Sequence, residues 1–174
     1  MGGLGAVLEG LPANAVYASA GAKTDLSAIA GSTPVIALNK GDRLQLGDMT
    51  IQVCSAGDES LVILLERGAF SMLFTGDIET ADEAELNLAR QVTVLKVAHH
   101  GSDTSTSALL LNQIRPNLAL ISCDPDYYGH PSPEVLRRLE EAGASVFRTD
   151  ACGAITLSVG GDVRVYTMIT QDGV

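Results

Sequence analysis

Apolar runs of strand length recur along the whole chain of 174 residues, and the segments between them change character halfway. In the first half these segments are short turns, such as residues 39–42 (Asn-Lys-Gly-Asp) and 67–68 (Arg-Gly), which predict hairpins. In the second half a helical pattern over residues 105–114 separates the strands expected at 92–98 and 118–123. The alternation predicts an α/β sandwich with mixed sheets (α+β in some schemes), and the length suits one domain.

The same patterns predict the other elements. Apolar runs and alternation predict strands at residues 14–18, 35–38, 43–46, 49–54, 61–66, 70–75, 146–148, 154–159 and 163–168, with a β-meander from residue 35. Helical spacing and capping signals predict helices at residues 2–11, 23–30, 80–90 and 132–143. Within them, Thr80 and Glu83 predict a capping box, and Ser105 or Thr106 is the expected cap of the helix that follows. Opposite charges four residues apart predict a solvated helix face, with the pairs Glu134/Arg138 and Arg137/Glu141.

The charge of the chain argues against one class of function and leaves another open. Lys and Arg total 11 against 21 Asp and Glu, which gives a formal net charge of −10. This balance argues against a uniformly basic nucleic-acid-binding surface. An acidic chain can still act on phosphates where a bound metal supplies positive charge.

No apolar run approaches the roughly 18–20 residues that span a bilayer. The N-terminus also lacks the positive region of a secretory signal. We therefore expect a soluble chain, either on its own or as one part of a larger membrane protein.

Three cysteines, Cys54, Cys123 and Cys152, form an odd set without a C-x-x-C pair. Buried free thiols are the expected state, because cysteine is common core material. A disulfide and a thiolate metal ligand are the alternatives.

The residues best suited to chemistry follow three expected strands directly. Asp77 ends a Thr-Gly-Asp segment, His99 and His100 follow the next strand, and His130 lies in a Gly-His-Pro loop after the third. Ligand sites of α/β sheets lie at the carboxyl ends of the strands. Imidazole and carboxylate suit zinc, manganese or iron, and a carboxylate can bridge two ions. The structural alternative is an ordinary Gly-Asp turn beside solvated histidines.

Nucleophilic catalysis is a rival interpretation of the same region. Ser102 could act with His99 or His100 and with Asp77 or Asp103, but the chain has no G-x-S-x-G elbow. It also has no phosphate-binding loop of the G-x-x-x-x-G-K-[ST] or G-x-G-x-x-G type. Trp is absent and aromatic residues make up 4%, which leaves few platforms for base stacking.

Four linked segments resemble the metallo-β-lactamase superfamily, and most of all the C-terminal domain of ComEC-type DNA-internalisation competence proteins. In chain order they are residues 73–77 (Leu-Phe-Thr-Gly-Asp), 94–102 (Val-Leu-Lys-Val-Ala-His-His-Gly-Ser), 128–131 (Tyr-Gly-His-Pro) and 148–155 (Arg-Thr-Asp with Gly-Ala-Ile). The resemblance covers nearly the whole chain. It implies an αββα sandwich with a centre of two zinc or manganese ions at the sheet edges. It also implies hydrolysis of phosphodiesters that degrades the DNA strand that is not imported.

The resemblance also implies roles for individual residues. Asp77 resembles the metal-bridging carboxylate, and His100 resembles the late histidine ligand. His99 lies beside it as a catalytic residue, and the ligand role within this pair stays open. His130 resembles a catalytic loop histidine near the scissile phosphate, whereas Lys96 is expected to be structural.

The chain departs from the family at its beginning. The superfamily's first metal motif, H-x-H-x-D-H, occurs nowhere in the sequence, and residues 1–4 (Met-Gly-Gly-Leu) stand where the family continues after it. We therefore expect residues 1–174 to be the C-terminal part of one domain that is incomplete at its N-terminus. Residues 54–60 also lack a histidine that other members carry, and Asp58 or Ser60 is expected there. A catalytic zinc site needs about three protein ligands, which predicts weak or no metal binding and little hydrolase activity for this chain.

Missing strands would leave an unpaired sheet edge, which predicts homo-oligomers. For the parent protein the resemblance implies single-stranded DNA as the partner, membrane contact only through other domains, and a place at the extracytoplasmic face of a bacterial plasma membrane. The alternatives are a small-molecule hydrolase of the same superfamily, acting on a thioester, lactam or phosphocholine ester, and a non-catalytic interaction domain. An upstream H-x-H-x-D-H motif that follows hydrophobic spans would favour the DNA-uptake protein. The same motif without hydrophobic spans would favour the small-molecule hydrolase. Absence of the motif would favour the interaction domain.

Overall fold

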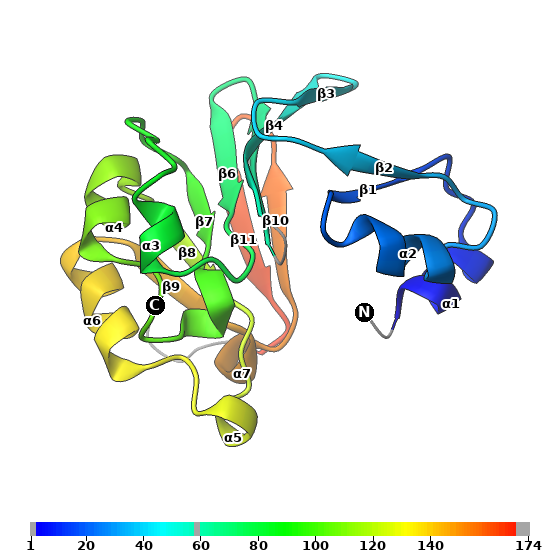
Figure 1. The fold of residues 1–174 in the computed structure, drawn as a ribbon. Helices are drawn as coiled ribbons and strands as arrows, with labels where there is room; N and C mark the ends of the chain where they lie inside the picture. The colour runs from blue at the N-terminus through cyan, green and yellow to red at the C-terminus, as the bar shows by residue number, and fades with distance from the viewer. Residues whose placement is uncertain (1–2, 58–59, 170–174) are drawn as a thin grey trace.

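A seven-stranded mixed sheet forms the centre of the computed structural model, which describes residues 3–57 and 60–169 (Figure 1). The strands lie in chain order: β3 (Arg43–Leu46), β4 (Met49–Ala56), β5 (Leu61–Arg67), β6 (Phe70–Phe74), β7 (Val94–Lys96), β8 (Leu118–Ile121) and β9 (Ser145–Arg148). Strands β3 to β6 pair antiparallel because short turns join them, as the sequence predicts. From β6 to β9 the pairs are parallel, since each connection contains helical structure.

Short helices fill these parallel connections. They are α3 (Thr80–Glu83), the 3₁₀-helix η1 (Ala98–Gly101), α4 (Ala108–Ile114), α5 (Pro125–Tyr128) and α6 (Pro133–Glu141), and α7 (Thr149–Cys152) follows β9. In Figure 1, α3, α4 and α6 cover the same face of the sheet. This arrangement confirms the α/β class and the mixed sheet.

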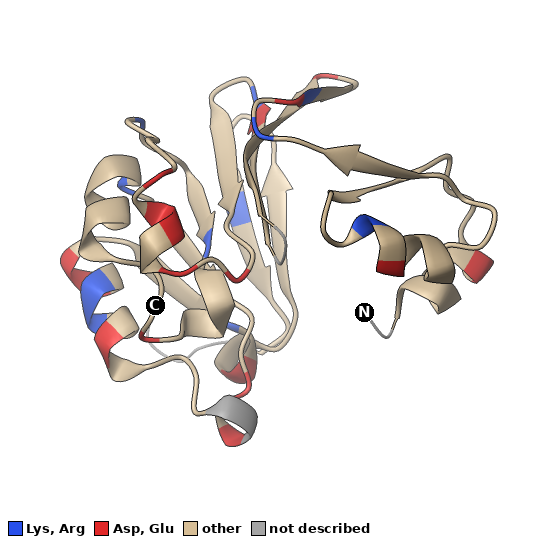
Figure 2. Cartoon of the chain, viewed as in Figure 1, with Lys and Arg blue, Asp and Glu red and all other residues tan. Residues whose placement is uncertain are grey.

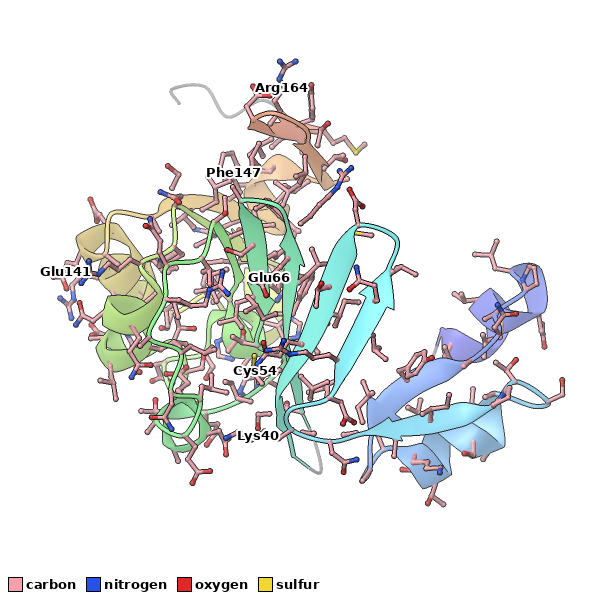
Figure 3. The ribbon with its side chains drawn as sticks, turned by 90° about the horizontal axis from the view of Figure 1, so that it is seen from above. Lys40, Cys54, Glu66, Glu141, Phe147 and Arg164 are labelled. Atoms are coloured by element: carbon pink, nitrogen blue, oxygen red, sulfur yellow. The ribbon has the colours of Figure 1, made fainter. Side chains whose placement is uncertain are left out.

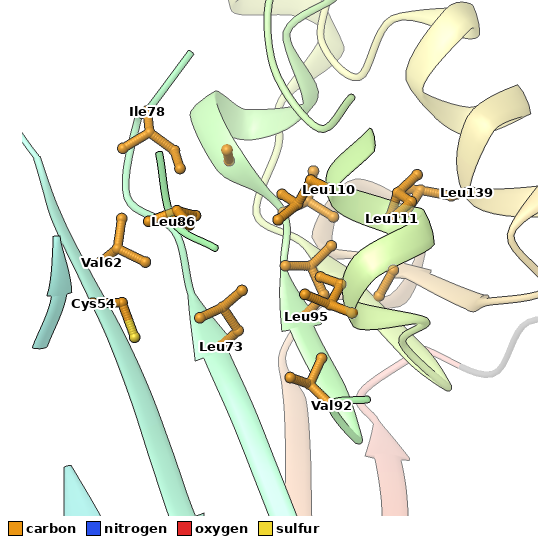
Figure 4. Close-up of a cluster of buried hydrophobic side chains, with 14 of the residues drawn as sticks. Cys54, Val62, Leu73, Ile78, Leu86, Val92, Leu95, Leu110, Leu111 and Leu139 are labelled. Carbon is orange, nitrogen blue, oxygen red and sulfur yellow. The ribbon is translucent and has the colours of Figure 1, made fainter. Parts of the chain in front are cut away.

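The core lies between that sheet face and the helices. Leu64, Leu73, Leu95 and Ala119 are paired across β5 to β8, so their side chains form one row on one face. All four are at most 1% exposed, and Figure 4 shows Leu95 close to Leu110 of α4. The whole cluster of buried residues contains Cys54, Val62, Leu64, Leu73, Ile78, Leu86, Val92, Leu95, Val97, Ala98, Leu110, Leu111, Ile114, Ala119, Ile121, Val135 and Leu139.

Two small sheets complete the fold. The antiparallel hairpin of β10 (Ile155–Val159) and β11 (Val163–Thr167) lies against the central sheet in Figure 1. A second unit consists of α1 (Leu4–Gly10), β1 (Val16–Ser19), α2 (Lys23–Ile29) and β2 (Val35–Leu38). Figures 1 and 3 both show this unit to the side of β3 and β4, and in the described residues each small sheet has two strands.

Several local predictions were wrong. Strand β2 is not part of the meander, because it pairs in parallel with β1 across the α2 crossover. Helix α3 ends at Glu83 instead of continuing to residue 90, and its capping box joins Glu79 and Asp82 rather than Thr80 and Glu83. The Glu83 side chain is unavailable for capping because it binds backbone N–H groups of a different segment.

Helices α4 and α6 bear out part of what their sequences predict. Ser132 caps α6 before Pro133, as expected, whereas α4 is capped by Ser107 rather than by Ser105 or Thr106. On α6, Arg137 forms ion pairs with both Glu134 and Glu141. The second guanidinium of this helix, on Arg138, donates to the carbonyls of Asp103 and Ser105 instead of pairing with Glu134.

All three cysteines are free thiols, with Cys54 and Cys152 buried and Cys123 half-buried. Across residues 3–57 and 60–169, none of the helices combines the length and apolar character needed to cross a membrane.

Candidate functional site

Strands β6, β7 and β8 run in parallel, so the segments that follow them begin at the same edge of the sheet. Asp77 follows β6 after a two-residue turn, and His99 and His100 lie in η1 directly after β7. His130 is further along the chain from β8, in the loop between α5 and α6. The topology therefore delivers all four predicted residues to one end of the sheet.

A cavity of about 580 Å³ opens at this edge. Its lining residues are Ser55, Gly57, Ser60, Asp77, Ile78, Glu79, Asp82 and His99. Asp77 and His99 thus share the cavity, whereas His100 and His130 are outside its lining. Three carboxylates make the wall acidic, and Figure 2 shows acidic residues on α3 and the adjoining loops. Asp58, which the sequence also suggested for this place, lies outside the described residues.

The two adjacent histidines face different surroundings because the backbone turns sharply at both. Their φ angles are +46° for His99 and +55° for His100, in the left-handed region that residues other than glycine rarely adopt. The His99 N–H donates to the Gly76 carbonyl at 3.0 Å, which joins this turn to the Asp77 turn. His100 instead has its ring Nδ1 2.7 Å from the Ser122 carbonyl oxygen.

One ring nitrogen of His99 has no hydrogen-bond partner in the described residues. This atom, Nδ1, is buried. The ring lies edge-on to that of His130, with 6.0 Å between centroids and 66° between planes. A buried ring nitrogen without a partner is costly.

Gly101 joins the His99–His100 turn to the loop that carries His130. Its φ is +87°, and a Cβ at this position would lie 2.6 Å from the Pro131 Cβ. The Ser132 N–H also donates to the Gly101 carbonyl at 2.9 Å. Only glycine permits this contact, so the H-H-G and G-H-P motifs are a matched pair.

Asp77 is exposed on a turn that is itself fixed. Gly76 has a φ of +58°, and a Cβ there would lie 3.2 Å from Ser60 Oγ and 3.3 Å from the Leu61 carbonyl. The Asp77 N–H donates to Ser60 Oγ at 3.0 Å. The backbone of Asp77 is therefore held from the start of β5.

Lys96 is the cation close to this acidic edge. Burial lowers the pKa of its ammonium, and the negative charge of Asp77 acts in the opposite direction. Its Nζ donates to the Val97 carbonyl at 2.9 Å. The structural role of Lys96 stays a prediction.

Two residues that bond to the backbone after the His99–His100 turn, Glu83 and Arg138, were not predicted from the sequence. Glu83 is 1% exposed, and its carboxylate accepts the N–H groups of Thr106 and Ser107 at the start of α4. From α6, Arg138 donates to the carbonyls of Asp103 and Ser105. The available signal was a run of Ser, Thr and Asp after His100, which needs buried partners once it enters the core.

The ends of β8 and β9 are joined by a second polar cluster. The Cys123 thiol donates to Asp150 Oδ1 at 3.1 Å, and Asp150 forms an ion pair with Arg148. The Arg148 guanidinium lowers the pKa of Asp150, whereas burial, followed by Asp150, raises the pKa of the Cys123 thiol. The thiol is therefore protonated at neutral pH and acts as a hydrogen-bond donor.

The cavity lining contains three carboxylates and one imidazole, donor types that suit a divalent metal. Asp77 offers a carboxylate and His99 a ring nitrogen without a partner. Over residues 3–57 and 60–169, no three His, Cys, Asp or Glu side chains come together as a metal-ligand group.

Comparison with known proteins identifies relatives that include a competence protein. No protein-family model matches the chain. It is 36% identical over 130 residues to ComE operon protein 3 of Bacillus subtilis (strain 168), which covers 68% of this chain and 17% of the relative. It is 37% identical over 109 residues to competence protein ComA of Neisseria gonorrhoeae, covering 59% and 16%. With recombination protein 2 of Haemophilus influenzae the identity is 39% over 103 residues, covering 57% and 13%. The matches therefore span less than a fifth of each relative.

Among solved structures, the fold matches that of Zn²⁺-bound PqqB from Methylobacterium extorquens with a TM-score of 0.52. The match covers 84% of this chain and 66% of that chain. Sequence identity is 12%, so the likeness concerns the fold alone.

Proposed function

This chain is a relative of the ComEC-type competence proteins and has the metallo-β-lactamase fold, and from that premise we propose that it is part of a metal-dependent phosphodiesterase that acts on DNA during uptake. The observation that carries the proposal is the cavity that Asp77 and His99 share at the ends of β6 and β7. Carboxylate and imidazole at the strand ends of such a sheet are suited to a hydrolytic metal centre.

Asp77 and one histidine of the adjacent pair hold the metal in this proposal. The shared cavity and the unpartnered Nδ1 support His99 as that histidine. The contact between His100 Nδ1 and the Ser122 carbonyl supports the other choice, because metal-ligating histidines commonly donate their second nitrogen to a carbonyl. Of the two, the cavity favours His99, and His100 then orients the turn.

Bound divalent ions would supply charge neutralisation of the phosphodiester and lower the pKa of a water. The chain's own residues perform the remaining tasks. Asp77 stays fixed through its backbone, and the His130 ring lies edge-on to that of His99, with 6.0 Å between centroids. His130 is suited to hold a phosphate oxygen or to protonate the leaving oxygen.

The ligand count supports a further part of the proposal, namely that residues 1–174 act together with ligands outside this chain. The sequence contains no H-x-H-x-D-H, and the described residues bring no three metal-ligand side chains together. We expect the chain alone to bind zinc or manganese weakly or not at all, and to have little hydrolase activity.

The proposal includes a setting as well as a reaction. We place the parent protein at the extracytoplasmic face of a bacterial plasma membrane, with membrane contact through its other domains and single-stranded DNA as substrate. The net charge of −10 leaves DNA affinity to the metals and to those other domains.

The test uses the protein translated from the complete reading frame. We expect it to contain H-x-H-x-D-H upstream of residue 1 and to degrade single-stranded DNA with Mn²⁺. Asp77→Asn should reduce the rate at least about a hundredfold, and Asp162→Asn, at a distant exposed site, should leave it unchanged. Absence of the motif, together with full activity of Asp77→Asn, would reject the proposal in favour of an interaction domain.

A further inference from the structure

We propose that Ser60 is the positioning residue of Asp77, and that its hydroxyl group sets the direction from which the Asp77 carboxylate enters the cavity. The inference rests on the proposed function, because it concerns the orientation of the proposed metal-bridging carboxylate. Ser60 lies just before β5, far from Asp77 in the sequence, and both residues line the same cavity.

The contact is direct and specific. Ser60 Oγ accepts the Asp77 N–H at 3.0 Å, so the hydroxyl oxygen holds the backbone atom next to the Asp77 Cα. This bond fixes where the side chain begins. No other hydrogen bond to the Asp77 N–H is found in the described residues.

Gly76 makes room for this contact. Its φ of +58° turns the chain out of β6, and a Cβ on it would lie 3.2 Å from Ser60 Oγ. The glycine therefore lets the serine hydroxyl approach the turn and reach the next N–H. Ser60, just before β5, thus forms one unit with Gly76 and Asp77, which follow β6.

Ser60 is itself held in place. Its carbonyl accepts the Gly57 N–H at 3.0 Å, a bond that links Ser60 to the residue after β4. The next residue, Leu61, begins β5 and pairs with Ala56 of β4. A hydroxyl on a fixed backbone can position its partner, whereas one on a free loop could not.

The turn that Ser60 holds also bonds to His99, the histidine that lines the same cavity. The Gly76 carbonyl accepts the His99 N–H at 3.0 Å, so the same turn that Ser60 holds also holds the histidine turn. Loss of the Ser60 hydroxyl would free Asp77 at its N–H and leave His99 bonded to Gly76. The carboxylate and the imidazole would then lose their fixed relation.

The chain offers matched variants for a test. Ser60→Ala removes the hydroxyl, Ser60→Thr retains it, and Ser55→Ala removes a hydroxyl that lines the same cavity without bonding to Asp77. Loss of one neutral hydrogen bond corresponds to a change of about fivefold. Ser60→Cys keeps the side-chain size with a weak acceptor and replaces the alanine variant should that variant fail to fold.

Two measurements are made on each variant, in the protein translated from the complete reading frame, because residues 1–174 alone are expected to bind Mn²⁺ weakly or not at all. Hydrogen exchange of the Asp77 amide should be about fivefold faster in Ser60→Ala, with Ser60→Thr and Ser55→Ala close to the unmodified chain. The Mn²⁺ affinity, followed by the electron paramagnetic resonance of free Mn²⁺, should fall about fivefold in Ser60→Ala and recover in Ser60→Thr. Equal affinity and equal exchange in Ser60→Ala and Ser55→Ala would overturn the inference.

A further variant separates this inference from the proposed function. If Asp77→Asn lowers Mn²⁺ affinity while Ser60→Ala does not, Ser60 is not a positioning residue and the proposed site stands. If Asp77→Asn leaves Mn²⁺ binding unchanged, the proposed metal role of Asp77 fails and the role of Ser60 fails with it.

Discussion

At the residue scale, Glu83 is a buried charged side chain whose carboxylate bonds to the backbone of another segment. Its carboxylate is 1% exposed and takes its hydrogen bonds from the N–H groups of Thr106 and Ser107. Thr106 has a φ of +55°, so the segment after the histidines is held in a backbone conformation that threonine rarely adopts. The carboxylate compensates for that conformation from α3.

We predict that Glu83→Gln lowers the free energy of unfolding by about 2–4 kcal/mol. The amide NH₂ would face backbone N–H donors, which leaves at least one buried donor without an acceptor. Urea denaturation of the variant measures the loss. The control, Glu140→Gln on the exposed face of α6, should change stability by less than about 0.5 kcal/mol. Equal midpoints for the two variants would contradict this role of Glu83.

A second prediction at this scale concerns Gly101. Gly101→Ala adds a methyl group 2.6 Å from Pro131, whereas Gly143→Ala adds one in open space at a similar positive φ. The strained backbone alone costs about 1 kcal/mol, and overpacking adds about 1–3 kcal/mol. Gly101→Ala should therefore be clearly the less stable of the two in chemical denaturation. It should also shift the ring signals of His99 and His130 in NMR spectra, and unchanged signals would show that the two loops are independent.

At the scale of elements, the ends of β8 and β9 are joined by Cys123, Arg148 and Asp150 rather than by apolar packing alone. The pKa of Asp150 is lowered in the folded state, first by its hydrogen bond to Arg148. Such a group stabilises the fold above its unfolded-state pKa, and that contribution is lost as the pH falls through the folded-state pKa.

This sign gives a pH-dependent prediction. The melting temperature of the unmodified chain should exceed that of Asp150→Asn near neutral pH, and the difference should shrink as the pH falls below about 4. Calorimetric scans between about pH 7 and pH 2 follow the difference. A gap that is constant over this range would show that the Asp150 charge does not contribute to stability.

Elements also show how far the sequence could predict the site. Asp77, His99 and His130 were placed at strand ends from apolar runs and glycine signals, and the parallel order of β6, β7 and β8 brings those ends together. The different surroundings of the two adjacent histidines could not be predicted. They depend on the bond from the His99 N–H to the Gly76 carbonyl and on the contact of the His100 ring with the Ser122 carbonyl, and both partners follow other strands. The sequence also predicted a longer helix α3 than the one observed. The cause is again a contact that is distant in the sequence, because Glu83 bonds to Thr106 and Ser107.

At the scale of the whole molecule, exposed apolar side chains concentrate on the two small sheets. They are Val7, Leu11, Tyr17, Ile29 and Ile36 in the unit of β1 and β2, and Tyr166, Met168 and Ile169 at the end of β11. Tyr17 and Ile36 are directly paired across β1 and β2, so they form one patch on one face. Apolar patches on sheets with free edges favour association.

We therefore predict dimers or larger assemblies at high protein concentration. Light scattering should give a mass above that of the 18.1 kDa monomer. The double variant Tyr17→Lys and Ile36→Lys should restore the monomer, because it places two like charges at the centre of the patch. The control, Leu109→Lys on α4, removes an exposed apolar side chain elsewhere and should leave the assembly intact. A strictly monomeric unmodified chain would contradict the prediction.

The central claim is that Asp77 and one histidine of the pair His99 and His100 form part of a metal site. The most direct measurement is a Zn²⁺ titration of the protein translated from the complete reading frame, followed by ¹⁵N NMR of the His99, His100 and His130 imidazole rings. We predict that a His99 ring nitrogen shifts on titration, and that Asp77→Asn raises the Zn²⁺ concentration required at least about tenfold. The claim is contradicted if neither His99 nor His100 responds, or if Asp77→Asn titrates like the unmodified chain.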